Sequence, residues 1–199
     1  MINKFSLDHQ SKNYLVISSD IESRYKTVIT KVSEYFDKSV EKILENPDVM
    51  YVSLPVIDKS GNITSTLSNY ELQMREYGLL DKLDTNRIGN EITIDQIREV
   101  ISFTQISAHK NKKIVILNSA SNMNMEASSA LLKTLEEVSS NCTFILLASS
   151  LNSIAETIIS RCQVLQHEGN LEMKKNSNFQ DFFFSKHPFL KNIDQANQY

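Results

Sequence analysis

The sequence predicts an α/β fold built on a doubly wound, mostly parallel sheet flanked by helices. Apolar strand-like segments alternate with helical ones along the chain, as a parallel sheet with crossover helices requires. The run TFILLAS (143–149) is too continuously apolar to have a solvated face and fits the middle of such a sheet. The 199 residues, 41% of them hydrophobic and 23% charged, suit one well-filled core.

The first half of the chain supplies two strands and a helix. Residues 14–17 (YLVI) predict the first strand, and residues 22–44 carry apolar side chains at helical spacing. A second strand is predicted at 49–54. The glycine-containing segment 58–69 (DKSGNITSTLSN) is expected to be a loop or a short hairpin.

The second half has sharper helix signals. Thr93 and Gln96 have the spacing of a capping box, which predicts a helix beginning there, and Ser153 and Glu156 repeat that spacing before a short helix. The other predicted elements are a strand at 114–117, a helix at 124–137 and a strand at 162–166.

The last segment, 167–199, breaks the pattern with a polar stretch followed by an aromatic group. It is expected to be a C-terminal tail or the start of a lid region. Its aromatic side chains either pack on the domain, begin a further domain or dock a partner. They are Phe179, Phe182, Phe183, Phe184 and Phe189.

Charge and hydropathy limit the kinds of partner that this protein is expected to bind. The formal charge of −3 gives no overall attraction to nucleic acid, and only short basic groups such as Lys110, Lys112 and Lys113 occur. No apolar run is long enough to span a bilayer, and the N-terminus lacks the apolar centre of a signal peptide. We therefore expect a soluble, cytoplasmic protein with no membrane contact.

The loop after the first predicted strand is where a nucleotide-binding protein of this fold class would hold phosphate. Such a loop needs G-x-x-x-x-G-K-[ST], because glycine lets backbone N–H groups approach the phosphates. Residues 20–27 read DIESRYKT, so Lys26 and Thr27 occupy the last two positions, whereas Asp20 and Tyr25 replace the glycines. A carboxylate repels phosphate and a tyrosine fills the required space, so ATP binding is not expected.

The residues directly after the predicted strand at 114–117 show whether the chain could hydrolyse a nucleotide. Hydrolysis of a nucleoside triphosphate needs a carboxylate there to hold magnesium, and usually another to orient water. This chain has Asn118 and Ser119, which supply no charge. We predict a degenerate acidic site, no bound metal and no intrinsic catalysis.

Several segments in the right order resemble one family, the delta prime subunit of the bacterial DNA polymerase III clamp loader, an AAA+ protein with a P-loop-type fold. The most specific feature is Ser-Arg-Cys placed shortly after ALLKTLEE, with a buried strand between them. The likeness covers about residues 10–166, and the predicted AAA+-like domain with its degenerate nucleotide site comprises residues 1–166. The segments are NPDV (46–49), ITIDQIRE (92–99), ALLKTLEE (130–137), TFILLAS (143–149) and ETIISRCQ (156–163).

The resemblance implies a non-hydrolysing subunit in which Arg161 acts as an arginine finger toward the ATP site of a neighbouring subunit. Ser160 would begin the turn, and Cys162 would anchor it in the core. A planar, permanently charged guanidinium suits the charge that spreads over phosphoryl oxygens during transfer. The plainer alternative is that Arg161 only caps its own short helix through the C-terminal carbonyls.

The resemblance also implies binding partners for this protein, and the sequence differs from the family in two respects. The partners are the motor and delta subunits of a DNA-directed DNA polymerase (nucleotidyltransferase) holoenzyme, with DNA contacted indirectly during replication. Family members usually carry a four-cysteine zinc module, but residues 45–92 contain no cysteine, so no zinc is expected. The collar domain is expected to be absent, which suggests a shortened form, a fragment or a variant stabilised by partners.

Two other functions stay open at this point. One is an active AAA+ ATPase or clamp-loader motor subunit that binds ATP itself. The other is a thiol enzyme using Cys142 or Cys162, although no C-x-x-C occurs, Cys142 precedes a buried strand and no histidine lies near it in sequence.

Overall fold

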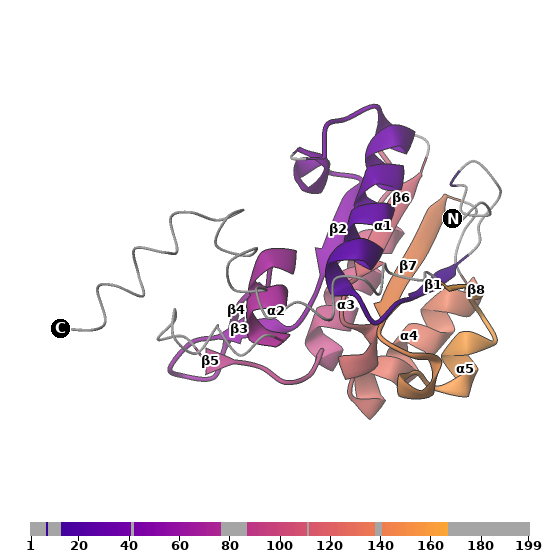
Figure 1. The fold of residues 1–199 in the computed structure, drawn as a ribbon. Coiled ribbons are helices and arrows are strands. Elements are labelled where there is room, and N and C mark those ends of the chain that lie inside the picture. The colour runs from indigo at the N-terminus through magenta and orange to yellow at the C-terminus, as the bar shows by residue number, and fades with distance from the viewer. Residues whose placement is uncertain are drawn as a thin grey trace, which may run out of the picture. The chain divides into compact units, whose positions relative to one another are not determined.

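A five-stranded sheet with strand order β2-β6-β7-β1-β8 forms the centre of the molecule (Figure 1). The computed structural model describes residue 7 and residues 13–40, 42–76, 87–110, 112–137 and 141–166. Each pairing within this sheet is parallel, which confirms the predicted fold class. The strands are β1 (Tyr14–Ile17), β2 (Val49–Val52), β6 (Lys113–Leu117), β7 (Cys142–Ala148) and β8 (Gln163–Gln166).

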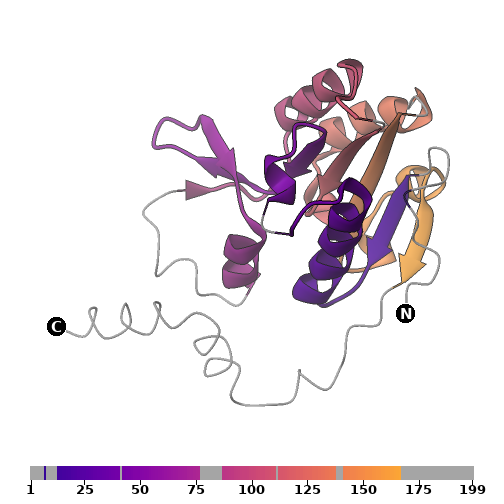
Figure 2. The same cartoon turned by 90° about the horizontal axis from the view of Figure 1, so that it is seen from above.

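Helices cover both faces of this sheet (Figure 2). Alternate strand side chains enter two separate cores, because successive residues of a strand point to opposite faces. Ile114 and Ile116 pack in the core that includes α1 residues, whereas Val115 and Leu117 pack in the core that includes α3 and α4 residues. The helices are α1 (Ile21–Phe36), α3 (Ile94–Gln105), α4 (Met125–Glu137) and the one-turn α5 (Glu156–Ile159).

The predicted central strand occupies the central position. β7 pairs with β6 on one side and β1 on the other, and all seven of its residues are buried. Its continuous hydrophobicity is explained by this placement, because a strand covered by helices on both faces has no solvated side.

Helix α1 ends earlier than predicted. Its apolar spacing continues to residue 44, but the helix stops at Phe36 because Asp37 adopts a left-handed backbone with φ of 51°. The N–H groups of Asp37 and Lys38 turn back to the carbonyls of Glu34 and Ser33, which closes the helix C-terminus. A separate 3₁₀ turn, η1 (Ile43–Glu45), follows.

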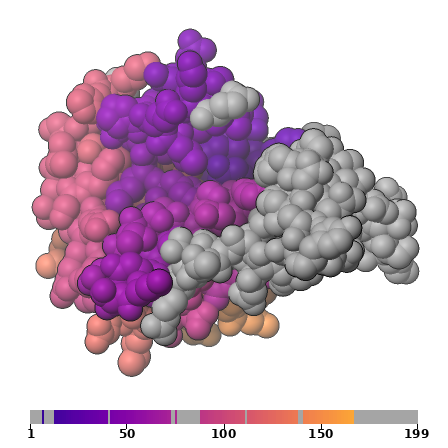
Figure 3. Space-filling view, turned by 90° about the vertical axis from the view of Figure 1, so that its left-hand side faces the viewer, coloured from indigo at the N-terminus to yellow at the C-terminus, as the bar shows by residue number. Residues whose placement is uncertain are grey.

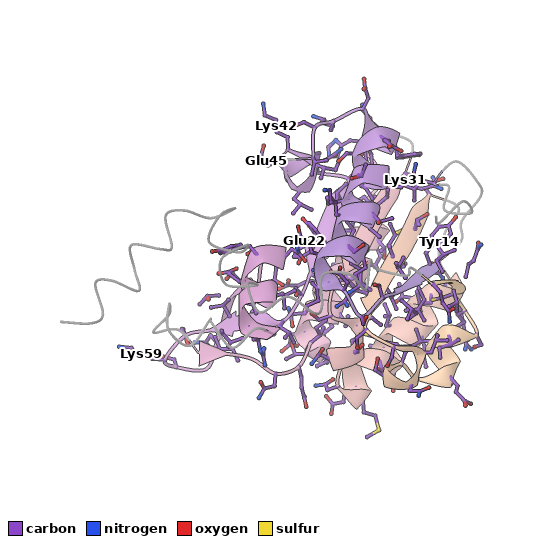
Figure 4. The ribbon with its side chains drawn as sticks, viewed as in Figure 1. Tyr14, Glu22, Lys31, Lys42, Glu45 and Lys59 are labelled. Carbon is purple, nitrogen blue, oxygen red and sulfur yellow. The ribbon has the colours of Figure 1, made fainter. Side chains whose placement is uncertain are left out.

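The region between β2 and α3 contains a second, antiparallel sheet with order β4-β3-β5. Figure 3 views the molecule from the side on which this sheet and α2 lie. Of the two predicted alternatives, loop or hairpin, the hairpin is present, with Lys59 in its connecting turn (Figure 4). The elements are β3 (Pro55–Ile57), β4 (Ile63–Thr66), α2 (Asn69–Glu76) and β5 (Arg87–Ile88).

Asp58 fixes the turn of this hairpin. Its Oδ1 accepts hydrogen bonds from the backbone N–H groups of Ser60 (2.8 Å) and Asn62 (2.9 Å). The hydrogen bond from Asn62 is the main reason that the pKa of the Asp58 carboxyl lies below its usual value. Gly61 takes a positive φ of 88°, which the turn requires.

The two predicted capping boxes have opposite outcomes. The one at Thr93 and Gln96 is confirmed, with both reciprocal hydrogen bonds present. The one at Ser153 and Glu156 is wrong, because α5 begins after Ala155 without a side-chain cap. The Ser153 hydroxyl instead lies 2.8 Å from that of Ser121 and donates to the carbonyl of Ser150.

The predicted C-terminal tail, 167–199, with its aromatic group, lies outside the described residues, so the domain boundary at 166 stays a prediction. Among the helices in the described ranges, none combines the length and apolar character needed to cross a bilayer.

Gly89→Ala is expected to destabilise the protein by about 1–3 kcal/mol, a typical cost of overpacking. A Cβ at position 89 would lie 2.6 Å from Cγ of Pro55, whose ring has little freedom to move. Chemical denaturation monitored by circular dichroism measures the change. Gly61→Asn is the matched control, because its site is open and asparagine tolerates positive φ; equal losses in both variants would contradict the steric explanation.

Candidate functional site

The N-terminus of α1 is the position that the sequence comparison with a phosphate-binding loop singled out, and the side chain of Asp20 caps it. Asp20 is the N-cap residue, and its Oδ1 accepts the backbone N–H of Ser23 at 3.1 Å. The N–H of Asp20 in turn donates to the hydroxyl of Ser18 at 3.2 Å. The carboxylate uses a donor and part of the positive helix dipole that an anionic ligand would need.

Arg24 and Tyr25 fill the space around this helix end. Arg24 is buried, and its Nη1 donates to the carbonyl of Ser18 at 2.6 Å. Tyr25 is partly buried and makes an edge-to-face contact with Tyr51, with ring centroids 6.1 Å apart. Burial raises the pKa of the Tyr25 hydroxyl, so the ring stays neutral.

The two residues that match a phosphate loop, Lys26 and Thr27, take no part in a cradle. Lys26 is exposed on α1. The hydroxyl of Thr27 donates back to the carbonyl of Ser23 at 2.8 Å, one helical turn earlier. The geometry therefore gives these two residues ordinary helical roles.

Asn118, directly after β6, is buried in a hydrogen-bonded cluster. Its Nδ2 donates to the hydroxyl of Tyr51 at 2.8 Å and to Oδ1 of Asn69 at 3.0 Å. Burial is the main cause that raises the pKa of Tyr51, so this hydroxyl is neutral at physiological pH. Ser119 is also buried, with its hydroxyl 3.1 Å from that of Ser53.

The loops after β1 and β6 are thus joined by a chain of contacts from Tyr25 through Tyr51 to Asn118. The sequence identified Tyr25 and Asn118, the first and last residues in this series of contacts, but gave no indication of Tyr51 or Asn69. Tyr51 lies in β2 opposite Ile116 of β6, so the strand pairing brings it to Asn118. No carboxylate hydrogen-bonds to Asn118 in the described part of the chain, but the nearby charge of Glu71 is a minor cause of the raised pKa of Tyr51.

Arg161 lies in the turn between α5 and β8, and its guanidinium is held by its own chain. Nε donates to Oε1 of Glu136 at 2.7 Å, and Nη2 donates to the same oxygen. Nη1 donates to the carbonyl of Thr157 at 2.7 Å and to the hydroxyl of Ser160 at 3.2 Å. The contact with a helical carbonyl is the one that the helix-capping alternative expects.

The turn that carries Arg161 is firmly attached to the domain. Asn13, just before β1, donates from Nδ2 to the carbonyls of Leu135 (3.1 Å) and Arg161 (3.3 Å). Its own carbonyl accepts the N–H of Gln163 at 2.7 Å. Ser160 ends α5, and Cys162 is partly buried against the core. Sequence reasoning missed Asn13 and Glu136 as supports of this turn.

Arg161 and the cluster around Asp20 lie at opposite edges of the sheet. All five strands are parallel, Asp20 and Asn118 follow the carboxyl ends of β1 and β6, and Arg161 precedes the amino end of β8. Figure 4 labels Tyr14 at the amino edge and Glu22 in the first turn of α1 at the carboxyl edge. A four-residue strand spans about 13 Å, so Arg161 is remote from the N-terminus of α1.

The short basic group does not form a free cationic surface. Lys112 and Lys113 are both buried. The Nζ of Lys112 donates to the carbonyl of Leu7 at 2.9 Å, and that of Lys113 donates to the carbonyl of Phe103 and lies 4.0 Å from the Phe103 ring centroid. Two of the three lysines are therefore used inside the fold.

The cysteine thiols are poor nucleophiles, and no metal-ligand cluster exists in the part of the chain that is described. Burial raises the pKa of Cys142 to about 11 and that of Cys162 to about 12. No group of three or more His, Cys, Asp or Glu side chains in the described ranges could hold a metal ion. The geometry gives no support to a thiol enzyme.

The five-stranded parallel sheet with helices on both faces defines an AAA+-like α/β fold. A family model described as "DNA polymerase III, delta subunit" matches residues 68–170, just over half of the chain. The chain belongs to this family, as the sequence resemblance implied.

Several characterised relatives agree with the family. The chain is 42% identical to DNA polymerase III subunit delta' of Haemophilus influenzae over 77 residues, 38% of this chain and 24% of that protein. It is 28% identical to replication factor C subunit 5 of Neurospora crassa over 141 residues, 70% of this chain and 38% of that protein. The chain thus spans about a quarter of the delta' relative and under half of the other.

A solved structure shows the same fold at low sequence identity. The crystal structure of a DNA polymerase III gamma subunit-related protein from Thermotoga maritima superposes with a TM-score of 0.53 and 17% identity. The superposition covers 92% of this chain and 50% of that chain.

Both cysteines are expected to react slowly with iodoacetamide in the native protein at pH 7.5, because their raised pKa values leave very little thiolate. Unfolding in urea should restore the rate of ordinary free thiols. Mass spectrometry of alkylated peptides measures both rates. A native rate equal to or above the unfolded rate at either cysteine would revive the thiol-enzyme alternative.

Asp20→Ala is expected to lower the free energy of unfolding by about 0.5–2 kcal/mol through loss of the N-cap. Asp20→Asn is the matched control, because asparagine caps equally well while removing the charge. Urea denaturation of the three proteins gives the comparison. An asparagine variant as unstable as the alanine variant would show that Asp20 has a role other than capping.

Proposed function

We propose that this chain acts as a non-hydrolysing subunit of a DNA polymerase III clamp loader, helping to load the sliding clamp for DNA replication. Arg161 is its working residue, and it reaches the ATP site of a neighbouring motor subunit. The observation that carries this proposal is the position of Arg161 at the sheet edge opposite to the chain's own nucleotide position. An arginine so placed has a use in phosphoryl transfer only in trans.

The Asp20 side chain that caps the N-terminus of α1 supports the proposal that the chain does not hydrolyse ATP. The Asp20 carboxylate would repel a triphosphate, and the buried Asn118 offers magnesium no negative charge. We infer that the chain binds no ATP. The segment from residue 45 to residue 92 has no cysteine, so we also infer that it binds no zinc.

The rigid attachment of the Ser-Arg-Cys turn supports the trans-acting half. Asn13 ties the carbonyl of Arg161 to that of Leu135 in α4, so the backbone of the turn is fixed while its side chain is partly exposed. An arginine on a fixed turn pre-organises charge stabilisation at little entropic cost. Supplying it from another subunit makes hydrolysis depend on assembly.

The remaining parts of the proposal follow from this role. The partners are the motor and delta subunits, DNA is contacted through them, and the assembly works in the cytoplasm as part of a DNA-directed DNA polymerase holoenzyme. The burial of Lys112 and Lys113 supports indirect contact with DNA, because these two charges are already used within the domain.

Arg161→Ala is expected to abolish stimulation of the neighbouring motor site, where an arginine finger contributes about 10³-fold or more to kcat. The measurement is the DNA- and clamp-stimulated ATPase rate of the cognate motor subunit, with the other subunits present, titrated with each protein. Association is measured in parallel by sedimentation. The alanine variant should assemble without raising the rate.

Arg98→Ala is the control, because Arg98 is also exposed and paired with a carboxylate, that of Asp95, but lies on α3. It should stimulate like the wild type. The proposal would be contradicted if the wild type neither assembles nor changes the rate, or if Arg161→Ala stimulates as well as the wild type.

A further inference from the structure

Glu136 of α4 holds the same part of the Arg161 side chain that an arginine finger presents to phosphate. Its Oε1 accepts from both Nε and Nη2 of the guanidinium. Carboxylate and phosphate oxygens bind this planar edge in the same way, because both accept two N–H groups side by side. One anion therefore excludes the other.

The guanidinium has little spare hydrogen-bonding capacity while Glu136 is bound. Of its five N–H groups, one on Nε and one on Nη2 go to Glu136, and two on Nη1 go to Thr157 and Ser160. Only one N–H on Nη2 remains. A finger that grips a phosphoryl group through two N–H groups must give up at least one of these partners.

The contact with Glu136 is the one that a phosphate can displace most readily. The side chains of Arg161 and Glu136 are 32% and 51% exposed, so water competes with the ion pair and weakens it. A nucleotide phosphate carries more negative charge than a carboxylate and competes for the same edge. The contacts of Nη1 with Thr157 and Ser160 are within its own turn and need not break.

We propose that Glu136 is a positioning residue for Arg161, holding the guanidinium against α4 in the separate chain and being exchanged for phosphate oxygens on assembly. The exchange rests on the proposed function of Arg161; the holding contact is a property of the chain alone. Glu136 thereby raises the concentration of subunit needed for assembly while leaving the assembled, phosphate-bound state unchanged.

The holding contact is tested on the purified full chain with phenylglyoxal, which modifies accessible arginine. Glu136→Gln preserves size but removes the charge, and Arg161 should then react about two- to fivefold faster, as expected for loss of an exposed ion pair. Peptide mass spectrometry measures the rate relative to Arg98 in the same sample. Glu137→Gln, the next exposed residue on α4, is the matched control and should change nothing.

The exchange is tested in the motor-subunit ATPase titration. Glu136→Gln should lower the half-saturating concentration of this chain about two- to fivefold and leave the maximal rate unchanged; combined with Arg161→Ala, it should have no effect. An unchanged Arg161 reactivity, or a reduced maximal rate, overturns the inference. A raised reactivity without any stimulation by the wild type instead overturns the proposed function, and the exchange falls with it.

Discussion

The common direction of the five strands is the constraint on which the arrangement of this domain depends. Because every pairing is parallel, all carboxyl ends meet at one edge and all amino ends at the other. Each return of the chain then needs a crossover, and α1, α3 and α4 bury their apolar sides on the sheet to provide it. The same constraint separates the loop after β1 from the turn before β8.

At the carboxyl edge of the sheet, several polar side chains hydrogen-bond to groups of the protein itself. Asp20 caps α1, and Asn118 hydrogen-bonds Tyr51 and Asn69. In a hydrolysing site those positions would be left for phosphate and magnesium, at some cost in stability to the empty protein. Here the side chains stabilise the fold directly, and the partly exposed Arg161 lies at the other edge of the sheet.

Much of the main sheet was predictable, because its signals are local or periodic. YLVI, IVIL and TFILLAS lie in buried strands, and the box at Thr93 and Gln96 begins α3. The end of α1 was not predictable, because an aspartate such as Asp37 is not a strong signal for the end of a helix. Ser68 and Glu71 form a capping box at the start of α2. This box was not predicted, because the segments on either side of it have only weak helix and strand signals. Glu136, 25 residues from Arg161, and Asn13 could not be paired with this turn without the fold.

The proposal that this chain binds no ATP is tested most directly by titrating magnesium ATP into the purified chain in a calorimeter. With the Asp20 carboxylate capping the α1 N-terminus and no carboxylate hydrogen-bonded to Asn118 among the described residues, we expect no saturable binding up to millimolar nucleotide. Micromolar, saturable binding that is lost on substitution of Lys26 would show that the loop after β1 still cradles phosphate, and would contradict the non-hydrolysing role.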